Sequence, residues 1–244
     1  MKDIINIVCD EGATSRVVIG SVEENFESLL PGGTPRIIIV TDAKVHANNL
    51  AFVNAHEHIV IGQGESSKTF VKLEEVYRQL LHMGADRSPF IVGMGGGIVT
   101  DVTGFVASTY MRGVRFGFLP TTLLAQVDAS IGGKNGVNLD GYKNIIGVFN
   151  QPEFVLCDPE LLSSLPDRAG LAEVIKAGII GDAELFSMVE RHSFEEIRSD
   201  APLLRELIIR SIRVKTAIVE HDQRERGERR KLNLGHTFAH AIEK

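Results

Sequence analysis

The sequence predicts an α/β fold followed by an all-helical part, and three observations indicate it. Short apolar runs rich in β-branched residues alternate with helical patterns through the first half of the chain. A glycine triplet, Gly95–Gly97, directly follows one of these runs, and after Gln151-Pro152 helical periodicity takes over. Near-continuous apolar runs are typical of parallel strands that are buried on both faces. We therefore expect an α/β domain over residues 1–165 and a helical domain over residues 166–244.

The composition is that of a globular protein with a small-molecule partner. The chain has 244 residues and a formal net charge of −6, which disfavours nucleic acid or an anionic membrane as a partner. No apolar run approaches the ~20 residues that span a bilayer, and the N-terminus lacks the apolar segment of a signal peptide. Two cysteines are too few for a disulfide framework. We expect a cytoplasmic protein with neither a nucleic-acid nor a membrane partner.

Strands and helices alternate in the first half. The β-branched run at 36–40 and the run at 58–61 each stop at polar or glycine residues, as buried parallel strands do. Between 69 and 83, apolar residues recur on one helical face. A third strand is predicted at 90–93. It leads into the glycine triplet, after which the pattern predicts a helix from about residue 101.

Polar residues follow these strands and form the candidate ligand site. The order strand, glycine loop, helix can hold a phosphate at the helix N-terminus, although the triplet does not match the full GxGxxG pattern. Asp42 would either bind a nucleotide ribose or cap the next helix. Glu65 and Lys68 precede the predicted helix, and charges at a helix start are the simpler interpretation.

Helices are predicted throughout the second half. Residues 163–170 are expected to form a linker, and the helices are expected at 171–180, 182–192, 201–221 and from about 232. His236 and His240 lie four apart, so on a helix they would share one face and could bind a metal or a substrate. Glu173 would either join them as a zinc ligand or pair with Lys176 one turn away.

Charged residues embedded in apolar sequence indicate a site for a negatively charged polar ligand. Buried charges are costly unless they are paired or bind something. Basic residues next to glycines or apolar stretches would form a cage for a phosphorylated, carboxylated substrate; they are Arg112, Lys134, Lys143, Lys176, Lys215 and Arg229. The run at 224–231 mixes both signs of charge and is expected to be a solvated loop.

Six ordered segments closely resemble the 3-dehydroquinate synthase family. They are GGGIVTDVTGF, YMRGVRF, PTTLLAQVDASIGGKNGVN, YKNIIGVFNQP, GLAEVIKAGII and LNLGHTFAHAIE. The resemblance implies a Rossmann-like N-terminal domain that binds NAD and a helical C-terminal domain that binds zinc or cobalt. It also implies a homodimer and a phosphorylated sugar-acid substrate, which is cyclised to 3-dehydroquinate through transient oxidation, phosphate elimination, reduction and aldol closure.

The resemblance also assigns roles to individual residues. The residues it implies for the NAD site are Asp42, Glu65, Lys68, Gly96, Gly97, Asp101, Thr121, Thr122 and Lys143. Glu173 and His236 match zinc ligands. The residues it implies for the substrate site are Asp128, Lys134, Asn144, Lys176, Lys215, Glu225, Arg229, Asn233 and His240. Arg112 resembles an arginine that a neighbouring subunit lends to the substrate phosphate.

Two departures and three alternatives accompany this interpretation. The family continues beyond the position of Lys244 with a further zinc-ligand histidine, so the helical domain is expected to be incomplete. The connection at 165–170 is a few residues shorter than in the family, which would shift the helix of Glu173. The alternatives are another sugar-phosphate cyclase, a metal-dependent alcohol or glycerol-phosphate dehydrogenase, and a non-catalytic NAD-binding fragment.

Overall fold

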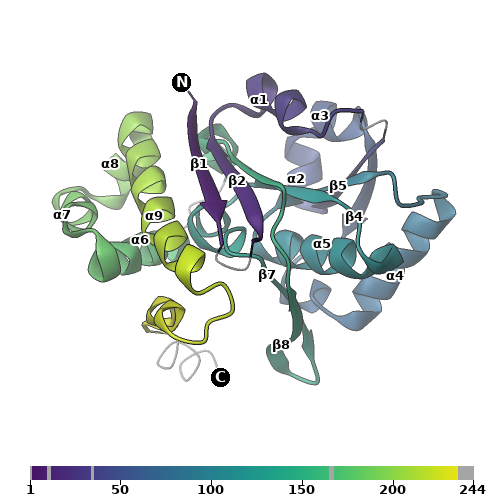
Figure 1. Ribbon diagram of the computed structural model, residues 1–244. Coiled ribbons are helices and arrows are strands. Elements are labelled where there is room, and N and C mark those ends of the chain that lie inside the picture. The colour runs from purple at the N-terminus through teal and green to yellow at the C-terminus, as the bar shows by residue number, and fades with distance from the viewer. Residues whose placement is uncertain (1, 10–11, 34–35, 165–167, 236–244) are drawn as a thin grey trace.

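A computed structural model describes residues 2–9, 12–33, 36–164 and 168–235, and it contains a twisted sheet with a helical part beside it (Figure 1). Within the described residues seven strands form this sheet, in the order β1-β2-β9-β6-β5-β3-β4. β1 pairs with β2 in antiparallel fashion, and every other neighbouring pair is parallel. The strands are β1 (Asp3–Val8), β2 (Thr14–Ile19), β3 (Ile37–Asp42), β4 (Glu57–Ile61), β5 (Phe90–Gly95), β6 (Phe116–Pro120) and β9 (Phe154–Cys157).

Both faces of the sheet are buried, which explains the apolar strands. Successive side chains of a strand point to opposite faces, so Ile38 and Ile39 belong to two different core clusters. Three helices contribute to one cluster: α1 (Val22–Leu29), α2 (Ala43–Asn48) and α3 (Leu50–Asn54). The longer helices α4 (Phe70–His82) and α5 (Gly97–Thr109) pack in the other cluster.

Helix α5 starts earlier than the sequence predicts. It begins at Gly97 rather than near residue 101, because Gly96 is in an extended conformation and already serves as the N-cap. A glycine N-cap lets a helix start within the triplet itself. The first turn of α5 therefore consists of the residues that directly follow β5, which brings its amide groups to the carboxyl edge of the sheet.

A β-hairpin lies against α5 and projects from the body (Figure 1). Its strands are β7 (Lys134–Leu139) and β8 (Tyr142–Phe149). The close approach depends on Gly104, since a Cβ there would lie 1.8 Å from Asn135 Oδ1. Short helical turns connect the remaining elements: η1 (Glu65–Ser67), η2 (Tyr110–Arg112), η3 (Ala125–Ala129, π-helical), η4 (Pro159–Ser164) and η5 (Glu228–Asn233).

The C-terminal part consists of four helices within the described residues: α6 (Arg168–Gly181), α7 (Ala183–Arg191), α8 (Phe194–Ser199) and α9 (Ala201–His221). Helix α6 starts inside the predicted linker at 163–170, so that linker is shorter than expected. Helix α8, which the sequence analysis did not identify, begins at a complete capping box formed by Ser193 and Glu196. The turn η5 ends at Asn233, and most of the helix expected from about 232 lies outside the described residues.

Helix α9 joins the helical part to the edge of the sheet. Arg205 forms an ion pair with Asp3 of β1 and donates to the Ile19 carbonyl of β2. Farther along α9, Glu220 accepts a hydrogen bond from the Val8 amide. The domain boundary predicted at 165/166 falls outside the described residues and stays a prediction. No helix in the described part of the chain is long and apolar enough to cross a membrane.

Candidate functional site

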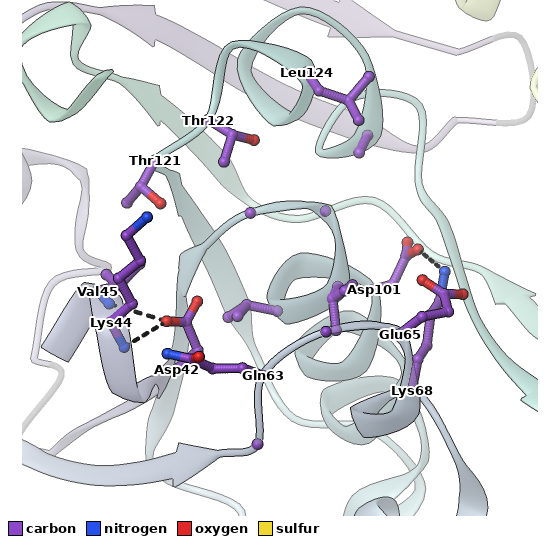
Figure 2. Close-up of a pocket in the computed structure, with 17 residues that line it drawn as sticks. Asp42, Lys44, Val45, Gln63, Glu65, Lys68, Asp101, Thr121, Thr122 and Leu124 are labelled. Carbon is purple, nitrogen blue, oxygen red and sulfur yellow. Dashed lines mark hydrogen bonds and ion pairs between the residues drawn. The ribbon is translucent and has the colours of Figure 1, made fainter. Parts of the chain in front are cut away.

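A pocket of about 550 Å³ opens at the carboxyl ends of β3, β5 and β6 (Figure 2). This edge of a parallel sheet, where loops lead into helices, is the usual ligand position in α/β folds. Eight of the nine residues expected to bind the cofactor line it: Asp42, Glu65, Lys68, Gly96, Gly97, Asp101, Thr121 and Thr122. The fold brings them together from four separate segments of the chain.

The N-terminus of α5 forms the floor of the pocket. A Cβ at Gly96 would lie 3.1 Å from Thr122 Cγ2, a tight contact that would push the two loops slightly apart. The first-turn amides of a helix have no partner within the helix, and its dipole attracts anions. The buried Thr121 hydroxyl also has no hydrogen-bond partner among the described residues. These features fit a diphosphate group of a dinucleotide.

Asp42 satisfies one of its two expected roles directly. Its Oδ1 accepts hydrogen bonds from the amides of Lys44 and Val45, both at 2.9 Å, and thereby caps α2. The same residue also lines the pocket. A capping carboxylate is held in a fixed position, so binding of a ribose by Asp42 remains compatible with this role.

Lys68 and Asp101 form an ion pair at one end of the pocket (Figure 2). Lys68 lies directly before α4, as expected for a charge at a helix start, but it is only 5% exposed. Burial raises the pKa of Asp101 to about 6, and the Lys68 ammonium opposes that rise. The ammonium also donates to Asn144 Oδ1 from β8. A substrate-site candidate, Asn144, is thus placed beside two cofactor-site candidates.

Asn138 is a polar residue of this region that sequence reasoning missed. Its Nδ2 donates to Glu65 Oε1 at 2.6 Å, and its Oδ1 accepts from the Asn144 amide at 2.8 Å. Asn138 lies in the strand β7, and an asparagine in a strand carries no charge that would mark it as a site residue. Its position two residues after Gly136, inside a family-like segment, was the available signal.

A second cluster of charged side chains lies on the other side of η3. Lys215, 8% exposed, donates to the carbonyl and carboxylate oxygens of Asp128. Burial lowers the pKa of Lys215; Asp128 opposes this shift, whereas the charges of Arg229 and Lys176 reinforce it. Ala129, the neighbour of Asp128, lines the pocket. The two sites therefore share the wall formed by η3.

Further residues of this cluster lie in the segment of the chain directly after α9. Arg229 is 2% exposed and donates to the carbonyls of Gly132 and Gln223. Glu225 pairs with Lys134 and accepts from Asn233. Burial alone would raise the pKa of Glu225, but these two donors, together with the charges of Lys134 and Arg229, outweigh it and the pKa is lowered. The loop predicted to be merely solvated therefore contributes Glu225 and a buried arginine to the cluster.

Some predicted site residues do not join either group. Lys143 is exposed on β8 and does not line the pocket. Arg112 is exposed after α5, at the end of that helix away from the pocket. Both Met111 and Arg112 have left-handed backbones, with φ of 51° and 67°. His236 and His240 lie outside the described residues.

Of the two expected metal donors, Glu173 lies within the described residues. Glu173 pairs with Lys176 one turn away on α6, and its role as a zinc ligand stays a prediction. No group of three or more His, Cys, Asp or Glu side chains that could hold a metal ion occurs within 2–9, 12–33, 36–164 and 168–235. The Glu173 carboxylate suits zinc as a donor, and the second expected donor is His236.

Two family models match the chain. The one described as 3-dehydroquinate synthase N-terminal matches residues 58–172, and the one described as 3-dehydroquinate synthase C-terminal matches residues 170–244. A 3-dehydroquinate synthase of Leptospira interrogans is 45% identical over 223 residues, which cover 88% of this chain and 62% of that protein. The chain thus spans less than two thirds of the length of this relative.

Two solved structures share the fold over nearly the whole chain. A 2-deoxy-scyllo-inosose synthase complexed with carbaglucose-6-phosphate, NAD+ and Co2+ has a TM-score of 0.87 at 28% identity, covering 99% of this chain and 70% of that one. A 2-epi-5-epi-valiolone synthase from Streptomyces hygroscopicus with NAD+ and Zn2+ bound has a TM-score of 0.85 at 29% identity, covering 94% and 68%. The predicted α/β fold with a helical C-terminal part is confirmed.

Proposed function

The chain belongs to the 3-dehydroquinate synthase family, and we propose that it converts 3-deoxy-D-arabino-heptulosonate 7-phosphate into 3-dehydroquinate and phosphate. One observation carries the proposal. A glycine-lined pocket and a buried basic cluster share the wall η3, whose Ala129 faces the pocket while Asp128 pairs with Lys215. A redox cofactor and a small anionic substrate would therefore meet at this wall.

NAD is assigned to the pocket. The α5 amides after Gly96 would hold its diphosphate, and Asp42 and Glu65 would accept hydrogen bonds from ribose hydroxyls. Lys68 and Asp101 close the other end of the pocket. The two solved neighbours that carry NAD+ support this assignment. Thr121, Thr122 and Gly97 complete the proposed set within the pocket, whereas Lys143 stays a prediction from the family resemblance.

The substrate is assigned to the basic cluster. Lys134, Lys176, Lys215 and Arg229 would bind the phosphate and carboxylate groups, whose charges would replace carboxylates that now pair with the lysines. Asp128, Asn144, Glu225, Asn233 and His240 would orient the hydroxyl groups. Burial lowers the pKa of Lys215, and the Asp128 carboxylate opposes this shift.

The cofactors supply the redox and acid chemistry. Bound NAD would accept a hydride and later return it, and a zinc or cobalt ion near Glu173 and His236 would lower the pKa of the reacting hydroxyl. This chain's own residues would bind the anionic groups, exclude water and hold the ring oxygens in place. We also propose a cytoplasmic homodimer without nucleic-acid or membrane partners, in which Arg112 serves the partner's substrate site.

Phosphate release by the 244-residue chain tests the proposal. We expect phosphate release from the heptulosonate 7-phosphate only when NAD and a divalent metal are both present, together with saturable NAD binding. Turnover that survives both NAD removal and chelation would contradict the mechanism. Turnover of a different sugar phosphate in its place would instead assign the chain to another cyclase activity.

A further inference from the structure

Asn138 connects three backbone segments around the charged end of the pocket. Besides its side-chain bonds to Glu65 and to the amide of Asn144, its own amide donates to the Lys68 carbonyl at 2.9 Å. Thr69 and Asn138 form a parallel bridge that continues this contact. The hairpin is thereby attached to the turn η1 and to the start of α4. Glu65 and Lys68 of that region line the pocket.

The Asn138 side chain has two partners, the Glu65 carboxylate and the backbone N–H of Asn144, so it must contain both a donor and an acceptor. The Glu65 carboxylate can only accept hydrogen bonds, and the backbone N–H of Asn144 can only donate one. A carboxamide satisfies both at once. An aspartate at position 138 would keep the acceptor for Asn144 but would place a carboxylate against Glu65, and an alanine would lose both contacts.

The contact with Asn144 stabilises an unusual backbone. Asn144 has a φ of 53°, a left-handed conformation that non-glycine residues seldom adopt. Three β8 residues, 143–145, lie opposite one β7 residue, because Val137 pairs with Ile146 and Leu139 with Tyr142. This bulge directs the Asn144 carboxamide to the Lys68 ammonium. One bond from Asn138 thus holds the conformation that places Asn144 beside the Lys68–Asp101 pair.

We propose that Asn138 is a positioning residue for cofactor binding, acting by holding Glu65 and Asn144 at the two sides of the charged end of the pocket. The inference rests on the proposed function, in which the pocket binds NAD. Asn138 itself does not line the pocket, so its effect on binding would come through its two partners.

A double-mutant cycle tests the link to Glu65. With Glu65 present, Asn138→Asp should raise the Kd for NAD about tenfold at pH 7.5, because two carboxylates replace a charged hydrogen bond. In a Glu65→Gln background the same change should alter Kd by less than about twofold. The carboxamide then at position 65 can donate to the carboxylate at position 138, so the hydrogen bond is restored in the opposite direction. Asn48→Asp, on the exposed side of α2, adds the same charge as a control.

Equal weakening in both backgrounds, or none in either, would overturn the inference. Hydrogen exchange of the ligand-free protein followed by NMR provides a second readout that needs no cofactor. Asn138→Ala should accelerate exchange at Asn144 and over 64–68, whereas Asn138→Asp should accelerate it only over 64–68. Unchanged exchange in both variants would also overturn it. If the unmodified chain fails to bind NAD, the proposed function of the pocket fails, and the exchange data alone decide the role of Asn138.

Discussion

Lys215 and Asp128 show at the scale of single residues how the cluster is held together. The ammonium is buried on α9 and meets both oxygen types of Asp128 at η3. Because α9 also contacts the sheet edge through Arg205 and Glu220, the pair lies at the junction of the helical part and the sheet. Its loss should therefore affect folding as well as binding.

Lys215→Met is expected to lower the free energy of unfolding by about 2 kcal/mol, the cost of leaving a charged group without its hydrogen-bond partner. Urea unfolding measures the change. Lys231→Met is the matched control, because Lys231 and Glu228 form an exposed ion pair and such pairs contribute little. If the free energy of unfolding fell equally in the two variants, the buried Lys215–Asp128 contact would contribute no more to stability than an exposed ion pair.

Asp101 should give the stability a characteristic pH dependence. Burial raises its pKa in the folded state from 3.8 to about 6, so the folded protein binds the proton more tightly than the unfolded chain does. The protonated carboxyl group thus favours folding at low pH, and this contribution is lost as pH rises from about 4 to about 6. The Asp101→Asn variant has no carboxyl group at this position and therefore lacks this pH-dependent contribution to stability. The stability of the unmodified chain relative to the variant should therefore fall over this window, measured by urea unfolding at several pH values; a rise would contradict the assignment.

Which site residues could be predicted depends on their charge and surroundings. Lys68, Asp101, Lys215 and Arg229 are charged residues near apolar stretches, and because burying a charge is costly, such residues indicate a site from the sequence alone. Asn138 is neutral and lies in a strand, and nothing in the sequence shows that its carboxamide meets two loops. Asp42 shows another limit, because capping and ligand binding place an acid at the same point of the chain.

At the scale of elements, periodicity decided what could be predicted. β3, β4, β5 and α4 have uninterrupted apolar or one-faced patterns, and they occur near the expected positions. β8 escaped prediction because its residues are mostly exposed, so no alternation marks it. β1 escaped because the apolar residues Ile4 and Val8 occupy exposed positions, and β2 because the polar Ser15 occupies a buried one, so in neither strand does the sequence alternate as the burial does. Tertiary packing, rather than local pattern, forms these strands.

The contact between α5 and β7 gives an element-scale prediction. Gly104→Ala should be destabilising by about 1 to 3 kcal/mol, because a Cβ would overlap Asn135 and overpacking costs about that much. This sign is opposite to the usual gain from glycine to alanine inside a helix. Thermal unfolding measures it. Combining Gly104→Ala with Asn135→Ala should cost less than the sum of the single changes, and strict additivity would refute a direct overlap.

At the scale of the whole molecule, the proposed homodimer predicts complementation between two inactive variants. Arg112→Ala would remove the group lent to a partner, and Lys134→Ala would damage the chain's own substrate site. Mixing the two after partial unfolding and refolding should restore up to about a quarter of the sites in a statistical mixture of dimers, measured as phosphate release. Arg78→Ala, at an exposed ion pair on α4, should stay fully active. Mixtures with no recovered activity would place Arg112 outside any shared site.

The bulge in β8 has a consequence for solubility. The outer edge of a two-stranded sheet exposes unpaired amides and carbonyls that can recruit a foreign strand, and β8 also exposes Tyr142 and Ile145. The left-handed turn at Asn144 breaks the straight ladder that such a strand would need. The backbone distortion that brings Asn144 to Lys68 therefore also protects the hairpin from edge-to-edge aggregation.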